Sequence, residues 1–274
     1  MIVSEALAEA SGALSHINGG ARDARWLAAS ALGVKRDRLA LIESEKIAED
    51  KLGKLREMVA KRAGHVPVSH LIGERDFYGR TFFVTRDVLD PRPETETLVA
   101  AALEEPFERV LDLGTGSGAI LLTLLAERAS ATGLGTDVSI GALAIAEKNA
   151  RRLGVLKRCQ VIRSDWWETV QGEFDLIVSN PPYIALAEMA TLSPELSHEP
   201  HGALTDGLDG LSAYREILLG ASEYLERGGR IALEFGKGQG RAVEDIAHAA
   251  GFTDTSFRAD LDGRDRVLMV KANF

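Results

Sequence analysis

The spacing of apolar residues divides the chain into two parts with different periods. Up to residue 64 apolar side chains recur three and four positions apart, as at Val3, Ala6, Leu7 and Ala10, and this spacing is typical of amphipathic helices. Glycines such as Gly33 and Gly64 then end the repeats. The pattern predicts a small bundle of four short helices, over residues 2–14, 22–32, 37–42 (with Asp37 as its cap) and 47–63.

Beyond residue 66 the period changes. Residues 77–84 are rich in aromatic side chains around Gly79, which predicts a β-hairpin between the two parts. Pro91 and Pro93 break the chain before a helix that begins near Thr95. We therefore expect two domains: a helical domain over residues 1–75, and the hairpin with a second domain over residues 76–274.

The second domain alternates strand-like and helix-like segments. Strands are expected at 109–113, 132–136, 159–163, 174–179, 230–235 and 266–270, and helices at 117–128, 139–153, 211–226 and 238–250. Such alternation with short connections predicts an α/β fold, a mostly parallel sheet with helices on both faces. Ligands of these sheets bind beyond the carboxyl ends of the strands, so motifs there matter most.

Charge and composition narrow the classes of function. The 274 residues carry a net charge of −9, and the two parts differ: residues 1–75 hold 12 Lys and Arg against 10 Asp and Glu, the remainder 20 against 31. An acidic second domain argues against direct nucleic-acid binding. The longest uncharged stretch, residues 113–126, is too short to span a bilayer, and Cys159 is the only cysteine. We expect a cytoplasmic protein without disulfides, membrane contact or a bound metal.

A glycine-rich loop follows the first strand of the second domain. The sequence Gly114, Thr115, Gly116, Ser117, Gly118 leads directly into an apolar helix. Glycines there let the backbone turn sharply and approach a ligand closely, with amides of the helix start exposed. Asp137 ends the next strand, where a carboxylate can accept hydrogen bonds from both ribose hydroxyls. Together these features predict a nucleoside-binding site.

A second motif follows the fourth strand, where Asn180, Pro181, Pro182 and Tyr183 come directly after an apolar run. The two prolines have no N–H group and fixed φ angles, so their carbonyls point in set directions. Asn180 offers a carbonyl and an amide, and Tyr183 offers an aromatic face. These groups predict a slot that holds a planar NH2 group.

Other interpretations stay open at this point. Gly114, Gly116 and Ala119 also satisfy a loose dinucleotide fingerprint, so a dehydrogenase or a nucleotide-binding module without catalysis is possible. His198 and His201 are spaced one residue short of a zinc-protease motif, and Pro200 disfavours a helix there, so we expect no metal.

The combined motifs resemble those of the protein-(glutamine-N5) methyltransferases of peptide chain release factors, class I enzymes that use S-adenosylmethionine. The resemblance covers almost the whole chain. It includes residues 70–74, 77–79 and 91–96, the glycine-rich loop, Ser164, Asp165 and Trp166, the tetrad from Asn180 to Tyr183, and Glu199, Pro200, Ala203 and Leu204. Two residues depart from the family pattern: Asp90 stands where the family usually has an apolar residue, and His201 stands where it often has an Arg.

The resemblance implies a role for each motif. Residues 114–118 and Asp137 would hold the methionine part and ribose of S-adenosylmethionine, Trp166 would lie against the adenine, and Asn180 would sit between donor and acceptor. The catalytic residues would be Asn180, Pro181 and Tyr183, and with Pro182 they would grip the glutamine of a Gly-Gly-Gln motif in class I release factors. The helical domain would dock the release factor. Glutamine methylation of a ribosomal protein and adenine-N6 methylation of DNA remain alternatives.

Overall fold

The computed structural model describes residues 1–272 and divides into two compact units. The helical unit consists of Met1–Glu74 together with Ser193–His198, and the sheet unit of Arg75–Leu192 with the chain from Glu199 onward. Residues 193–198 were expected in the second domain. In the structure this segment packs within the helical unit.

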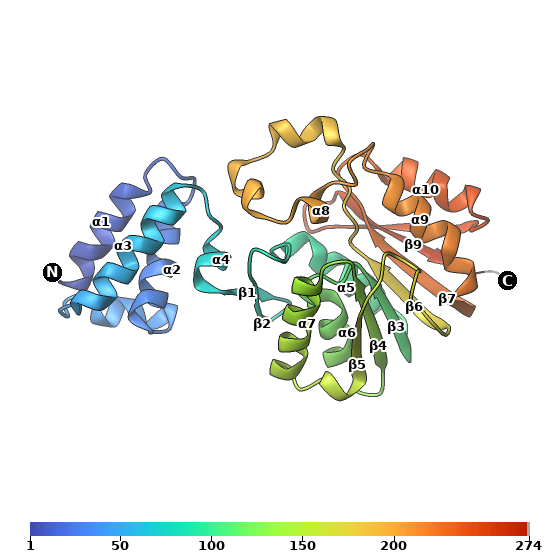
Figure 1. The fold of residues 1–274 in the computed structure, drawn as a ribbon, viewed down its shortest axis with the longest axis horizontal. Helices are drawn as coiled ribbons and strands as arrows, with labels where there is room; N and C mark the ends of the chain where they lie inside the picture. Colours follow the sequence, from blue (N-terminus) through green and yellow to red (C-terminus); the bar gives the residue numbers. More distant parts are fainter. Residues whose placement is uncertain (273–274) are drawn as a thin grey trace. The chain divides into compact units, whose positions relative to one another are not determined.

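The helical unit is built around one apolar core. It contains α1 (Val3–Ala13), α2 (Gly20–Leu32), η1 (Arg36–Ile42), α3 (Glu49–Ala63), α4 (Val68–Ile72) and η5 (Pro194–His198) (Figure 1). Residues such as Leu14, Leu27 and Leu55 fill the core, as their helical spacing predicts. The third predicted helix is instead the 3-10 helix η1, and Asp37 does not cap it. Only Leu39 of this segment is buried, so little packing is available to stabilise an α-helix. Helix α4 was not anticipated.

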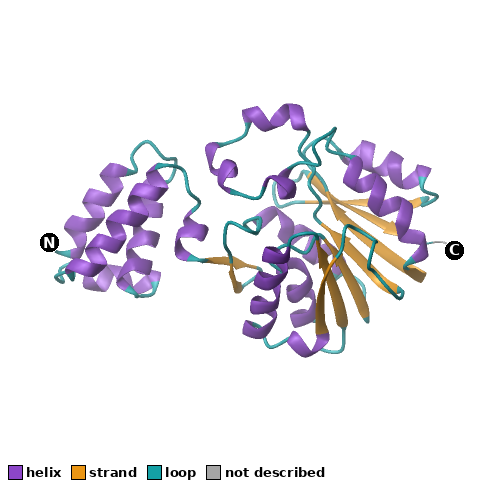
Figure 2. Ribbon diagram, viewed as in Figure 1, coloured by secondary structure: helices purple, strands orange, loops and turns teal. Residues whose placement is uncertain are grey.

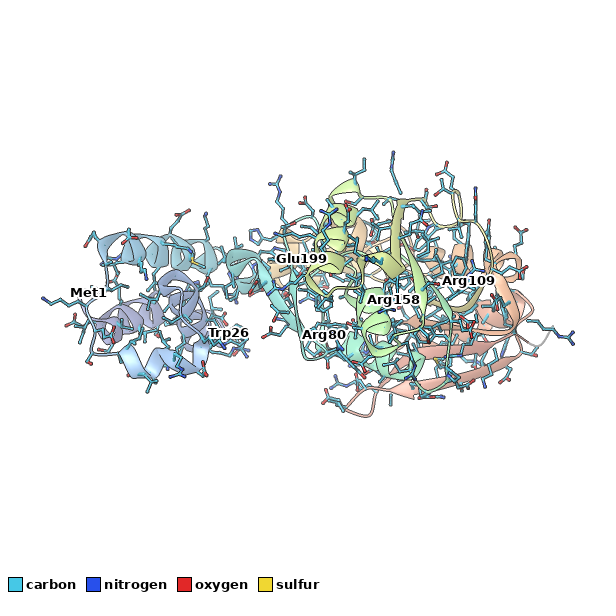
Figure 3. The ribbon with its side chains drawn as sticks, turned by 90° about the horizontal axis from the view of Figure 1, so that it is seen from below. Met1, Trp26, Arg80, Arg109, Arg158 and Glu199 are labelled. Carbon is cyan, nitrogen blue, oxygen red and sulfur yellow. The ribbon has the colours of Figure 1, made fainter. Side chains whose placement is uncertain are left out.

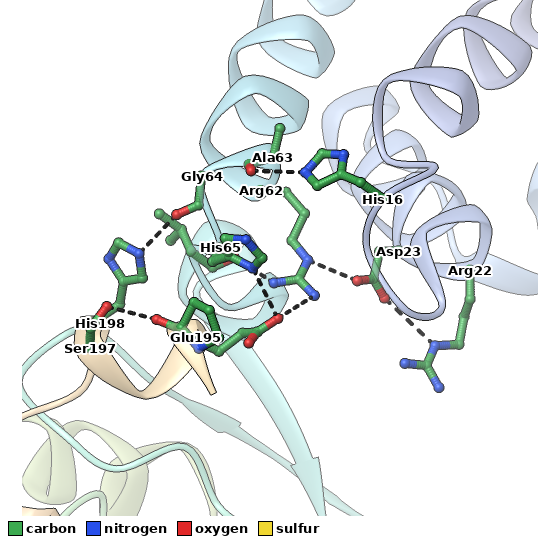
Figure 4. A network of polar contacts seen from close by, with 12 residues as sticks. His16, Arg22, Asp23, Arg62, Ala63, Gly64, His65, Glu195, Ser197 and His198 are labelled. Carbon is green, nitrogen blue, oxygen red and sulfur yellow. Dashed lines mark hydrogen bonds and ion pairs between the residues drawn. The ribbon is translucent and has the colours of Figure 1, made fainter. Parts of the chain in front are cut away.

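An ion pair between Arg62 and Glu195 ties residues 193–198 to the helices (Figure 4). Arg62 on α3 donates to Asp23 Oδ2 at 2.8 Å, with both side chains buried, and to Glu195 Oε1 at 3.3 Å. His65 Nδ1 lies 3.5 Å from the same Glu195 oxygen, and a ring nitrogen of His198 lies 3.0 Å from the carbonyl oxygen of Gly64. The sequence does not reveal this attachment, because it joins residues more than 130 positions apart.

The sheet unit begins with the hairpin of β1 (Glu74–Phe77) and β2 (Arg80–Phe83). Its two turn residues, Tyr78 and Gly79, have φ angles of 49° and 70°. Positive φ at both positions is the geometry whose twist suits a two-residue hairpin. The hairpin is as predicted, although its first strand starts before residue 77. Phe77 and Phe82 are buried and meet edge to face.

A seven-stranded sheet forms the centre of this unit, with strand order β5-β4-β3-β6-β7-β9-β8. Its strands are β3 (Arg109–Leu113), β4 (Thr132–Asp137), β5 (Cys159–Arg163), β6 (Phe174–Ser179), β7 (Leu225–Glu234), β8 (Asp254–Ala259) and β9 (Asp265–Lys271). The five strands from β5 to β7 are parallel, and β9 runs antiparallel to both of its neighbours, β7 and β8. The mostly parallel sheet is confirmed, whereas β8 was missed. The helix predicted to end at residue 226 ends earlier, because β7 already begins at Leu225.

Helices cover both faces of the sheet (Figure 2). Helices α5 (Glu96–Ala102), α6 (Ala119–Glu127) and α7 (Ile140–Arg152) lie on one face, and α9 (Ser212–Gly220) and α10 (Gly240–Ala249) on the other. Shorter helical turns are η2 (Pro93–Thr95), η3 (Leu156–Arg158), η4 (Leu186–Thr191), α8 (His201–Leu204) and η6 (Ala221–Glu223). Within residues 1–272 no helix is both long and apolar enough to cross a membrane.

The topology brings the two sequence motifs together. Strand β3 pairs with β4 on one side and β6 on the other, and Leu113 at the end of β3 is in register with Ser179 at the end of β6. The connections that leave β3 and β6 therefore begin side by side at the switch point of the sheet, where open α/β folds bind ligands.

Candidate active site

A cavity of about 410 Å³ opens at this switch point. That volume is within the usual range for pockets that hold a small ligand or cofactor. Of the residues assigned to the cofactor, the lining includes Gly114, Thr115, Gly116, Ser117, Asp137, Trp166 and Asn180; of those assigned to the substrate, it includes Asn180 and Pro182. Gly118, Pro181 and Tyr183 are not among the lining residues.

The glycine-rich loop needs left-handed backbone at alternate positions. The φ angles of Gly114, Gly116 and Gly118 are 73°, 55° and 79°, a region that L-residues rarely adopt. A Cβ atom at Gly114 or Gly116 would meet nothing within 4 Å, whereas one at Gly118 would lie 2.7 Å from Leu122 Cδ1. The first two glycines therefore leave space on the cavity side, and Gly118 permits close packing of α6.

Asp137 links the loop to the end of β4. Its Oδ2 accepts from the backbone N–H of Gly116 at 2.9 Å, and its Oδ1 accepts from the N–H of Ser139 at 2.8 Å. Burial raises the pKa of this carboxyl, although the two backbone hydrogen bonds oppose the rise. Each oxygen retains a lone pair, so the carboxylate can still accept hydrogen bonds from a ligand in the cavity.

Asp112 on β3, which was not among the predicted site residues, supports the loop from a buried position. Thr115 Oγ1 donates to Asp112 Oδ2 at 2.7 Å, and both residues are buried. Burial raises the pKa of Asp112 to about 7. The position of Asp112 just before the glycines was the available signal, but its burial is a property of the folded sheet.

Trp166 has a backbone conformation that is rare for a bulky residue, with φ of 43°. The hydroxyl of Ser164 donates to the Trp166 carbonyl at 2.9 Å and accepts from Thr169 N–H at 3.0 Å, which stabilises this turn. Strained backbone of this kind is common at ligand sites. Here it presents the indole to the cavity.

The carboxamide of Asn180 is held at one end only. Its Nδ2 donates to Thr95 Oγ1 at 3.2 Å, whereas its Oδ1 is buried and has no hydrogen-bond partner among residues 1–272. Buried polar atoms are usually satisfied, so an unpartnered acceptor on a cavity wall marks a place for a donor from a ligand. Thr95 was not among the predicted site residues.

The rest of the tetrad is fixed by its neighbours. The carbonyl of Tyr183 accepts from Gln239 Nε2 at 2.8 Å, and Gln239 Oε1 in turn accepts from Gly236 N–H at 2.9 Å. Pro181 is buried. The Tyr183 ring packs against the core under α9 and α10, and burial raises the pKa of its phenol to about 12. The ring is therefore neutral at physiological pH.

Two ion pairs explain charged residues near the site. Arg92, which lines the cavity, donates to the buried carboxylate of Glu199 at 2.5 Å (Figure 3 shows where Glu199 lies). Asp90, which departs from the family pattern, is buried 3.5 Å from Arg75 Nη1. The ion pair with Arg75 therefore explains how an acidic side chain is accommodated at this buried position. His201 is an exposed residue at the start of α8. Within the described chain no three His, Cys, Asp or Glu side chains are placed to hold a metal ion.

The cavity suits a nucleoside with an attached amino acid. Asp137 offers acceptors for ribose hydroxyls, the loop offers space beside Gly114 and Gly116, and Trp166 offers an aromatic surface for a base.

Similarities to known proteins extend over both units of the chain. The family model described as methyltransferase small domain matches residues 85–240, and the PrmC N-terminal domain matches residues 5–73. A release factor glutamine methyltransferase of Cereibacter sphaeroides is 51% identical over 94% of each chain. One of Rhodospirillum rubrum is 42% identical over 91% of this chain and 78% of the relative. In fold, the chain matches a T. thermophilus 16S rRNA methyltransferase solved with AdoMet and guanosine (TM-score 0.52, 21% identity, 73% of this chain and 50% of that one).

Proposed function

Because the chain belongs to the release factor glutamine methyltransferase family, we propose that its sheet unit methylates the side-chain nitrogen (N5) of the glutamine in the Gly-Gly-Gln motif of class I peptide chain release factors. The methyl donor is S-adenosylmethionine. The observation that carries the proposal is the buried, unpartnered Oδ1 of Asn180 on the wall of a nucleoside-sized cavity.

The cofactor would be held by residues at or just after the ends of β3, β4 and β5. Asp137 would accept hydrogen bonds from the ribose hydroxyls, Gly114 and Gly116 would leave room for the methionine part, and Trp166 would lie against the adenine. When bound, S-adenosylmethionine would supply an electrophilic methyl group on a sulfonium; transfer breaks the S–CH3 bond, leaves S-adenosylhomocysteine, and releases one proton from the methylated nitrogen.

The substrate amide is held by the end of β6. The NH2 group of the glutamine would donate one hydrogen bond to Asn180 Oδ1 and one to the carbonyl of Pro181. Tyr183 is the aromatic residue proposed to meet the plane of the amide, although its ring packs largely against the core and does not line the cavity. Together these contacts set the direction in which the nitrogen lone pair points.

Orientation matters because an amide nitrogen is a poor nucleophile. Its lone pair is delocalised by the same resonance that gives a peptide bond a rotation barrier of about 18–20 kcal/mol. Alignment of reacting groups contributes up to about 7–11 kcal/mol. No general base is required before transfer, since the nitrogen's proton becomes acidic only as the new bond forms.

The helical unit is proposed to dock the intact release factor. Its nearly balanced charge differs from the acidic remainder and suits a protein partner. Since release factors act in translation termination, we propose that the enzyme works in the cytoplasm.

Mass spectrometry of a Gly-Gly-Gln peptide from a release factor, incubated with enzyme and S-adenosylmethionine, tests this function. We expect one added methyl group on the glutamine, and none on a matched Gly-Gly-Asn peptide, a glutamine peptide from a ribosomal protein or an adenine-containing oligonucleotide. Asn180→Ala is expected to lower kcat by about 100- to 1000-fold, as loss of a transition-state contact does, with a much smaller effect on cofactor affinity. An unmethylated Gly-Gly-Gln peptide, or equal losses in kcat and affinity, would contradict the proposal.

A further inference from the structure

A chain of polar groups runs from the sheet to the reacting amide. Glu234 ends β7 and is only 1% exposed. Thr95, in η2, acts on the Glu234 carboxyl as a hydrogen-bond donor that opposes the rise in its pKa. Thr95 Oγ1 also accepts a hydrogen bond from Asn180 Nδ2 at 3.2 Å. Thr95 and Asn180 line the cavity, whereas Glu234 lies behind them.

The donor and acceptor roles of Glu234, Thr95 and Asn180 fix the direction of the hydrogen bonds between them. An ionised carboxylate only accepts, so Thr95 must donate its single hydroxyl proton to Glu234. The Thr95 oxygen is then an acceptor toward Asn180. Of the two ends of the Asn180 carboxamide only Nδ2 carries hydrogens, so Nδ2 faces Thr95 and Oδ1 faces the cavity.

We propose that Thr95 and Glu234 are positioning residues that select the orientation of the Asn180 amide, so that its oxygen and not its NH2 group meets the substrate nitrogen. This inference rests on the function proposed above. The two orientations of a carboxamide have nearly the same shape, so packing alone selects neither. The flipped form would place a donor against the donor NH2 group of glutamine and lose the hydrogen bond.

Glu234, Thr95 and Asn180 form a hydrogen-bond relay, and the protonation state of Glu234 decides how strongly this relay orients the Asn180 amide. Burial raises the pKa of this carboxyl to about 7, and the hydrogen bond from Thr95 opposes the rise. When protonated, Glu234 can donate to Thr95, and Thr95 can then direct its own proton toward Asn180 and favour the flipped amide. Charged or titratable groups that act on Glu234 come from β9, η2 and its preceding loop, the tetrad and α9: Arg266, Glu94, Arg92, Tyr183 and Tyr214.

Steady-state kinetics of Thr95 variants on the Gly-Gly-Gln peptide test the relay. Thr95→Val keeps the shape but cannot accept a hydrogen bond, and we expect kcat to fall about 10- to 100-fold, as misplacement of a reacting group does. The affinity for S-adenosylmethionine should change little, and Thr95→Ser should restore most of the turnover. Thr123→Val is the matched control, because Thr123 is a buried threonine on α6 whose hydroxyl has no hydrogen-bond partner within residues 1–272.

The pH dependence separates a positioning role from a structural one. Wild-type kcat should rise between about pH 6 and about pH 8 as Glu234 ionises, and Glu234→Gln should remove that rise. The relay is overturned if the wild type methylates the peptide and Thr95→Val retains full kcat, or if Glu234→Gln keeps the wild-type pH profile. An inactive wild type would instead refute the proposed function.

Discussion

A methyl group added at Gly114 or at Gly118 should have different consequences, although both residues have left-handed backbone. An L-residue in that conformation costs about 1–2 kcal/mol, and this is the whole cost expected for Gly114→Ala, whose Cβ would meet nothing within 4 Å. At Gly118 the Cβ would lie 2.7 Å from Leu122 Cδ1 and 3.3 Å from Ala146 Cβ. Leu122 and Ala146 are fully buried, so overpacking adds about 1–3 kcal/mol. Gly118→Ala should therefore lower the free energy of unfolding by about 2–5 kcal/mol in total.

Binding should follow the opposite order. The Cβ of Gly114→Ala projects into space beside the cavity that the cofactor is proposed to fill, so we expect the Kd for S-adenosylmethionine to rise about 10-fold or more, a change of about 1.4 kcal/mol. Gly118 does not line the cavity, so Gly118→Ala should weaken binding less. Urea unfolding gives the stabilities and titration calorimetry the affinities. If Gly118→Ala is no less stable than Gly114→Ala, or if Gly114→Ala binds the cofactor as the wild type does, the reasoning fails.

Three further predictions concern buried charge and backbone strain. The pKa of Asp112 rises from 3.8 to about 7 on folding, so the folded protein holds this proton more tightly than the unfolded chain and the free energy of unfolding falls as pH rises through that interval. Between about pH 5 and about pH 8 the free energy of unfolding should fall by about 3 kcal/mol more for the wild type than for Asp112→Asn, measured by urea unfolding at each pH. Asp23→Ala leaves Arg62 buried without its main partner and should destabilise the helical unit by about 3–5 kcal/mol, seen as faster hydrogen exchange in α2 and α3; unchanged exchange would contradict the pairing. With this variant KM should rise for an intact release factor but not for a short Gly-Gly-Gln peptide, and equal effects would argue against docking. Ser164→Ala removes the hydroxyl that stabilises the turn at Trp166 and should weaken cofactor binding, whereas an unchanged Kd would show that the turn holds without it.

The sequence was most informative where a local rule and the fold agree. The strands Arg109–Leu113 and Phe174–Ser179 were predicted with their observed bounds, because short apolar runs between polar turns specify buried parallel strands. The hairpin turn at Gly79 and the loop at Gly114 follow from the conformational freedom of glycine. By contrast, β8 was missed because Asp254–Ala259 has few apolar residues, and its pairing with β9 is what makes it a strand.

By itself, the sequence determined the α/β fold class and the motifs that carry the proposed chemistry, because periodicity, glycine and proline act within a few residues. The tertiary structure decided which groups support those motifs. Thr95 and Glu234 are far from Asn180 along the chain, and residues 193–198 are far from Arg62. No local pattern reports such pairings, since hydrogen bonds between distant residues and the burial that shifts their pKa values exist only once the sheet has assembled.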